Sequence, residues 1–271
     1  MASISLIAQT DIISAKELKD LMKSNQELVV VHAGKSKAYN QNHIKGAIRI
    51  HHMDMYQKEN DVSGLLKSPE ELAAFFGELG ISENSEVVIY DNGSQKYNTR
   101  IYWALKYLGA KNVKMLHNDM GEWGKVRLPL TTAATELKPV TFTPTVDPTI
   151  LADLEYVKNN KDNDNVVLID ARTVEEYTGE DEKSDGHIPG AINVNYELFL
   201  TDDGAFKSEE DIRALVTELG ITPEMEVIAY CKTSVRAAPV FVAFKNILGF
   251  ENVKVYDGAY NEWTVDNTLE Q

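Results

Sequence analysis

The amino-acid sequence repeats itself, and this repeat restricts the possible folds more than any other feature. The stretch LGAKNVKMLHNDMGEW, residues 108–123, recurs as LGFENVKVYDGAYNEW, residues 248–263. The offset is 248 − 108 = 140 residues, and HIKGAI at His43 recurs at a similar offset as HIPGAI at His187. A chain of 271 residues is also long enough for two domains. The sequence therefore predicts two copies of one fold in tandem.

Each half alternates between short apolar runs rich in β-branched residues and segments with apolar residues at helical spacing. The expected strands are 28–31, 48–50, 87–90, 113–116, 166–170, a run that ends at Val194, 227–230 and 253–256. The expected helices include 209–219 and 235–248, and two more are predicted to start at the capping boxes Ser14-x-x-Glu17 and Ser68-x-x-Glu71. Such alternation predicts the α/β class, with a parallel sheet flanked by helices in each half.

A segment between the two repeats has the composition of a linker. Residues 128–148 are rich in Thr and Pro and show little apolar periodicity. We therefore expect a first domain over residues 1–127, a linker over 128–145 and a second domain over 146–271.

Composition excludes several classes of function. The 27 Lys and Arg against 42 Asp and Glu give a net charge of −15, which disfavours nucleic acids and anionic membranes as partners. No apolar run is long enough to span a bilayer, and the first residues lack a basic region, so we expect a cytoplasmic protein. A single cysteine excludes intrachain disulfides and Cys-rich zinc sites. His51, His52 and Asp54 lack a further ligand at the usual spacing, so neither a metal nor a cofactor is expected.

The cysteine occupies a position that suits catalysis. Cys231 directly follows the expected strand 226–230, and a polar loop through Arg236 leads into the next helix. Ligands of open parallel sheets bind at the carboxyl ends of the strands. Lys232 and Arg236 favour the thiolate, and successive N–H groups of a tight loop can bind an anion. Many free cysteines are simply buried apolar residues, but this position and these cations favour a nucleophile.

The first half lacks these chemical groups. At the 140-residue offset, Cys231 corresponds to Asp91. At the end of a neighbouring strand, Asp170-Ala171-Arg172 corresponds to His32-Ala33-Gly34, at an offset of 170 − 32 = 138 residues. The histidines and tryptophans that both halves share are therefore expected to serve the fold. We infer one active half and one inactive half.

Taken in order, these motifs resemble the rhodanese family, specifically its tandem-domain sulfurtransferases. They are DAR at Asp170–Arg172, GHIPGA at Gly186–Ala191, the Cys231 loop, and YDGxxxEW at Tyr256–Trp263. The resemblance implies two rhodanese-like domains, the second catalytic and the first inactive, with Asp91 in place of the cysteine. It also implies an enzyme, a sulfurtransferase whose cysteine takes a sulfane sulfur as a persulfide and passes it to cyanide or a thiol.

The resemblance also suggests how a donor would bind. It implies substrate-binding roles for Arg172, Lys232, Thr233, Ser234, Val235 and Arg236. The loop CKTSVR is closest to the Cys-Arg-x-Gly-x-Arg type that accompanies thiosulfate in the family, with Ser234 in place of Gly. Serine at such a turn resists backbone conformations that glycine adopts freely. Two loop cations suit the two negative charges of thiosulfate, which we expect as donor, with 3-mercaptopyruvate as the alternative.

Two other classes of function fit the sequence less well. Cysteine phosphatases of related fold have five residues between Cys and Arg, whereas four separate Cys231 from Arg236. Non-catalytic rhodanese-like domains that bind partners typically lack the cysteine, which this chain retains. The expected partners are therefore a small anionic sulfur donor and a thiol or cyanide acceptor. The acidic stretch 178–183 is expected to be a solvated loop at the rim of the pocket.

Overall fold

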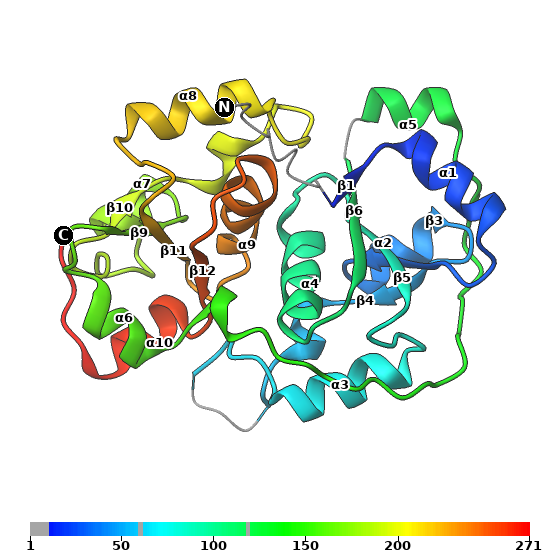
Figure 1. Ribbon diagram of the computed structural model, residues 1–271, viewed down its shortest axis with the longest axis horizontal. Helices are drawn as coiled ribbons and strands as arrows, with labels where there is room; N and C mark the ends of the chain where they lie inside the picture. The colour runs from blue at the N-terminus through cyan, green and yellow to red at the C-terminus, as the bar shows by residue number, and fades with distance from the viewer. Residues whose placement is uncertain (1–10, 59–61, 118–119) are drawn as a thin grey trace, which may run out of the picture.

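The computed structural model describes residues 11–58, 62–117 and 120–271, and it contains two five-stranded parallel sheets flanked by helices (Figure 1). The strands of the first sheet are β1 (Ile12–Ile13), β2 (Val29–Ala33), β4 (Ile48–Ile50), β5 (Glu86–Tyr90) and β6 (Asn112–Leu116). Those of the second are β8 (Leu151–Ala152), β9 (Val166–Asp170), β10 (Ile192–Asn193), β11 (Glu226–Tyr230) and β12 (Val253–Tyr256). These strands confirm the predicted α/β class with two parallel sheets.

The two sheets have the same topology. Their strand orders are β1-β6-β5-β2-β4 and β8-β12-β11-β9-β10, and every pairing within them is parallel. Central strands β5 and β11 are buried along most of their length, which explains their continuous runs of apolar residues. The sequence repeat is therefore a structural repeat, strand for strand.

Helices follow the strands in both halves. The first half has α1 (Ala15–Ser24), α2 (Ser36–Gln41), α3 (Pro69–Glu78), α4 (Lys96–Tyr107), α5 (Met120–Val126) and the 3₁₀ turn η1 (His52–Met55). The second half has α6 (Leu154–Asn160), α7 (Val174–Thr178), α8 (Glu209–Glu218), α9 (Ala237–Val242), α10 (Ala259–Asp266) and the 3₁₀ turns η2 (Pro148–Ile150) and η3 (Tyr196–Phe199). Both predicted capping boxes are present, because Ser14 and Ser68 accept the N–H groups of Glu17 and Glu71 at 3.2 Å.

The helix expected over 235–248 differs from the prediction. It is α9 followed by a π-helical segment, η4 (Ala243–Ile247). This wider turn lies where the second half meets α4, and there Asn246 Nδ2 donates to the Tyr102 hydroxyl at 2.7 Å. The departure from regular α-helix thus occurs at the contact between the halves, which a periodicity within one helix does not reveal.

The segment predicted as a linker lies along the first half. Its start forms β7 (Leu130–Thr131), which pairs antiparallel with β3 (His43–Ile44). Further on, the Val140 N–H donates to the Gly77 carbonyl at 2.9 Å, and Phe142 is buried. The residues after the segment then enter the second sheet as β8. The predicted domain limits stay predictions, but this segment is held by hydrogen bonds and an apolar anchor.

The two halves meet through helices α4 and α9 (Figure 1). Trp103 of α4 and Phe241 of α9 belong to one cluster of buried apolar residues that spans both halves. Because an apolar interface of this kind excludes water, groups enclosed in it act in a medium of low polarity. Among the described helices, none is both long and apolar enough to cross a membrane.

Candidate active site

Cys231 lies directly after β11, at the carboxyl end of the central strand of the second sheet. Its side chain is almost fully buried, with 1% exposed. The Arg236 N–H donates to Cys231 Sγ at 3.2 Å, and the Tyr260 N–H donates to the Cys231 carbonyl at 2.9 Å. The loop 231–236 therefore curls around the sulfur and directs a backbone donor at it.

Ser234 occupies the turn where the related loop type has glycine. Its φ is +58°, in the left-handed region that disfavours side chains. The Ser234 hydroxyl is fully buried and donates to the Tyr256 carbonyl at the end of β12. This hydrogen bond compensates for the unfavourable backbone conformation, and it directs the Ser234 side chain towards β12 and away from Cys231.

Arg236 is held by a carboxylate that the sequence did not single out. Its Nη1 and Nη2 lie 2.5 and 2.8 Å from the two carboxylate oxygens of Glu176 in α7. Burial alone would lower the pKa of Arg236, but Glu176 raises it above its ordinary range, so the guanidinium stays charged. The available signal was local: Thr173-x-x-Glu176 is a capping box directly after the DAR motif.

Arg172 is also paired, and it is fully buried. Its Nε and Nη2 donate to the Asp170 carboxylate, Nη1 donates to Ser184 Oγ at 2.9 Å, and Nη2 also donates to the Gly186 carbonyl at 2.8 Å. The guanidinium carbon lies 4.2 Å from the centre of the Tyr260 ring. These contacts tie together the DAR and GHIPGA motifs. A direct contact of Arg172 with a donor stays a prediction, and the contacts described here belong to the fold.

The remaining loop residues differ in their accessibility. Lys232 is half-buried, forms no ion pair with a described residue, and donates from Nζ to the Lys183 carbonyl at 3.2 Å. The acidic stretch thus borders the loop. Thr233 is half-buried, whereas Val235 is buried and belongs to the apolar core. The structure thus brings the residues 231–236 together around Cys231, and it places Arg172 among the supporting motifs.

In the equivalent loop of the first half, backbone N–H groups bind a negatively charged side chain. Asp91 follows β5 as Cys231 follows β11. Its carboxylate accepts the N–H groups of Gly93 at 2.9 Å, Ser94 at 3.1 Å, and Gln95 and Tyr97 at 3.3 Å. The loop is therefore an anion cradle that the chain fills with its own carboxylate.

Each of these two loops is covered by a glycine from the other half. A Cβ on Gly64 would lie 2.7 Å from the Thr233 Cβ, and one on Gly204 would lie 1.9 Å from the Gly93 carbonyl oxygen. The pairs are equivalent, because 64 + 140 = 204 and 93 + 140 = 233. The two halves thus cap one another in a reciprocal way, and the first half closes over the loop that bears the cysteine.

Shared histidines and tryptophans serve the fold, as the repeat suggested. His43 stacks on Tyr39 at 3.7 Å between ring centres, and its counterpart His187 stacks on Tyr177 at 3.6 Å. Trp263 Nε1 donates to the Thr268 carbonyl at 2.9 Å. Within the described ranges, no group of three or more His, Cys, Asp or Glu side chains could hold a metal ion.

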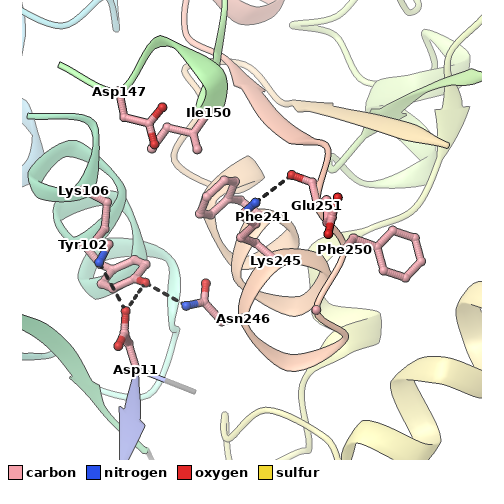
Figure 2. Close-up of a pocket in the computed structure, with 11 residues that line it drawn as sticks. Asp11, Tyr102, Lys106, Asp147, Ile150, Phe241, Lys245, Asn246, Phe250 and Glu251 are labelled. Carbon is pink, nitrogen blue, oxygen red and sulfur yellow. Dashed lines mark hydrogen bonds and ion pairs between the residues drawn. The ribbon is translucent and has the colours of Figure 1, made fainter. Parts of the chain in front are cut away.

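A pocket between the two halves lies apart from the cysteine loop. Figure 2 shows this pocket of about 390 Å³, in which Tyr102 donates to Asp11 at 2.6 Å and accepts from Asn246. Lys106 from α4 and Lys245 from η4 also line it. None of its lining residues belongs to the loop 231–236. This pocket is therefore separate from the loop that bears Cys231.

Comparison with known proteins agrees with this geometry. The sequence model of the rhodanese-like domain matches residues 14–125 and 153–266. The chain is 33% identical over 242 residues to the sulfur carrier protein TtuD of Thermus thermophilus, which covers 83% of each chain. It is 30% identical over 235 residues to the thiosulfate sulfurtransferase of Cricetulus griseus, covering 84% of this chain and 79% of that one.

Solved structures share the whole arrangement. The 3-mercaptopyruvate sulfotransferase SseA of Escherichia coli superposes with a TM-score of 0.83 at 26% identity, covering 93% of this chain and 99% of SseA. A variant of EanB in complex with ergothioneine has a TM-score of 0.87 at 21% identity, covering 97% of this chain and 71% of that one. The second likeness concerns the fold alone. With two matching domains in tandem, the chain belongs to the rhodanese-like family.

Proposed function

We propose that this protein is a sulfurtransferase that moves a sulfane sulfur from thiosulfate to a thiol or cyanide through a persulfide on Cys231. The observation that carries the proposal is the pair of equivalent loops. In one, backbone N–H groups hold the Asp91 carboxylate, and in the other the Arg236 N–H donates to a sulfur. The same backbone device that holds a carboxylate suits a thiolate or a persulfide anion.

The reaction balances without a cofactor. The Cys231 thiolate attacks the outer sulfur of thiosulfate, a new S–S bond forms, and the S–S bond of the donor breaks. Sulfite leaves with the bonding electron pair. In the second step, cyanide or a thiolate attacks the outer sulfur of the persulfide, which releases thiocyanate or a new persulfide and restores the thiolate. A lone cysteine suits this carrier, because a neighbouring thiol would discharge the persulfide as a disulfide.

The surroundings of Cys231 support this class over its rivals. Arg236 is bound by Glu176, so it is not free to bind a phosphate as the arginine of a phosphatase loop must. Lys232 is the loop cation without an ion pair among the described residues and is placed to attract an anionic donor. We place the reaction in the cytoplasm, where thiols stay reduced and can serve as acceptors.

The test compares the wild type with Cys231→Ser. We expect the wild type to gain about 32 Da on incubation with thiosulfate and to form thiocyanate from cyanide, whereas the serine variant does neither. Equal turnover by both proteins would remove the catalytic claim. Parallel assays with 3-mercaptopyruvate and a thiol decide the donor, since faster turnover of 3-mercaptopyruvate by the wild type would make it the preferred donor.

A further inference from the structure

The residues that the sequence suggested for donor binding provide little free positive charge. Arg236 is bound by both oxygens of Glu176, and Arg172 is bound by Asp170. Lys232 has no ion pair with a described residue, but one half-buried lysine is a modest site for a dianion. A further cation for an anionic donor would have to come from the interface with the first half.

A buried arginine of the first half meets this need. Arg100 lies in α4, and its side chain is 0% exposed. Its Nη2 donates to the Asp257 carboxylate of the second half and lies 3.5 Å from the Gly64 carbonyl. Its Nε and Nη1 have no hydrogen-bond partner among the described residues. Unsatisfied buried N–H groups of a guanidinium are costly, so they call for a ligand.

The Arg100 guanidinium lies close to the cysteine loop. Gly64, which is near Nη2 of Arg100, is the residue that packs on Thr233. Burial alone would lower the pKa of Arg100, but Asp257 raises that pKa above its ordinary value. Cys231 contributes to the same increase by a smaller amount. The Tyr56 hydroxyl is also buried here without a hydrogen bond of good geometry, and burial raises its pKa to about 12, so it stays a donor.

The repeat provides an internal control. Tyr56 has an equivalent tyrosine in the second half, Tyr196, because 56 + 140 = 196. Arg100 has none, since position 240 is Val240. The arginine thus occurs only in the half that faces the cysteine loop, and the half that faces the Asp91 loop has an apolar residue instead. An arginine that served only to stabilise the interface would not need to occur only opposite the loop that bears the thiol.

We propose that Arg100 binds the oxygen atoms of the anionic sulfur donor through Nε and Nη1, so that the donor site of Cys231 is completed by the first half across the interface. Asp257 positions the guanidinium by binding Nη2, and its other oxygen accepts the Leu66 N–H at 3.0 Å. The Tyr56 hydroxyl is a further donor to the same oxygen atoms. This inference rests on the proposed function and names the group that selects an anionic donor.

The experiment uses the full-length protein and three variants. Arg100→Met alone leaves the Asp257 carboxylate buried without its partner, which can unfold the chain. The double variant Arg100→Met/Asp257→Asn removes both charges and keeps the interface neutral. Arg213→Met is the matched control, since it also removes one arginine, but from an exposed pair with Glu209 on α8.

Two readouts separate binding from structure. We expect the KM for thiosulfate of the double variant to rise at least tenfold, because charge-assisted hydrogen bonds to the donor are lost. Discharge of a preformed persulfide by dithiothreitol, a neutral thiol, should stay within twofold of the wild type. Arg213→Met should match the wild type in both. If the folded double variant has a KM for thiosulfate within twofold of the wild type, the assignment of Arg100 is wrong. It is also wrong if the reaction with thiosulfate and the discharge of the persulfide slow by the same factor.

The role of Arg100 and the sulfurtransferase activity of Cys231 can be disproved separately. If the wild type gains no mass of about 32 Da from thiosulfate, the proposed function is wrong. If the wild type gains that mass and the double variant gains it at the same thiosulfate concentrations, only the role of Arg100 is wrong. A direct titration of Cys231→Ser with sulfite, the leaving group, provides a second measure. Its affinity should fall at least tenfold when the Arg100 and Asp257 substitutions are added.

Discussion

Single residues around Cys231 have tasks that their chemical type alone does not reveal. Serine resists the left-handed backbone conformation that this turn requires, yet Ser234 adopts it, and its hydroxyl donates to the Tyr256 carbonyl at the end of β12. Arg172 looked like a substrate ligand and lies buried between Asp170 and Ser184. A contact between Arg172 and a donor stays a prediction.

A pair of substitutions at Ser234 tests the hydrogen bond to the Tyr256 carbonyl. Ser234→Ala keeps the backbone strain and loses the hydrogen bond, so we expect about 1–3 kcal/mol lower stability. Ser234→Gly loses the same bond but relieves about 1–2 kcal/mol of left-handed strain, so its stability should stay within about 1 kcal/mol of the wild type. Urea unfolding of the three proteins measures this, and a glycine variant no more stable than the alanine variant would contradict it.

At the scale of elements, the cysteine loop is held by a helix that follows the neighbouring strand β9. Helix α7 provides Glu176, whose carboxylate binds both terminal nitrogens of Arg236. Burial alone would raise the pKa of Glu176, but Arg236 outweighs burial and holds that pKa below its ordinary value of 4.5. The link between α7 and the loop therefore depends on an ionised carboxylate.

Acid should weaken this link in a defined range. Because the pKa of Glu176 is lowered in the folded state, its contribution to stability is present above about pH 4.5 and is lost as the pH falls through the folded-state value. We expect Glu176→Gln to be about 2 kcal/mol less stable at pH 7. The difference from wild type should shrink below pH 4.5 in urea unfolding series. A difference that stays constant down to pH 3 would exclude the ion pair as its source.

The whole molecule is a pseudosymmetric pair of halves in which one of two equivalent loops has a cysteine, Cys231, and the other has Asp91. Each half covers the loop of the other with a glycine, Gly64 over Thr233 and Gly204 over Gly93. In the Asp91 loop the carboxylate accepts the loop's own N–H groups, whereas the Cys231 loop has a thiol at that place and is covered by Gly64, whose carbonyl lies 3.5 Å from Arg100 Nη2. The first half thus packs directly on the loop that bears the cysteine.

Substitution of Gly64 tests this role of the first half. Gly64→Ala would place a Cβ 2.7 Å from the Thr233 Cβ, so we expect at least a tenfold loss of kcat/KM for thiosulfate as the loop shifts. Gly46→Ala is the matched control, because Gly46 also has a positive φ, +87°, but no atom within 4 Å of the added Cβ. Both should lose about 1–2 kcal/mol of stability. Equal activity of the two variants would show that the contact does not support catalysis.

The sequence by itself determined the repeat, the α/β class, the parallel sheets, the capped helix starts and the position of Cys231 after a central strand. These features follow from local spacing and apolar patterns, which each segment carries within itself. Only the tertiary structure decided which charged side chains form ion pairs with one another. Glu176 binds Arg236 from 60 residues away, and Arg100 reaches Asp257 from the other half. Such pairings depend on how finished elements pack against one another, because distance in space between charges sets their energy and no local pattern encodes it.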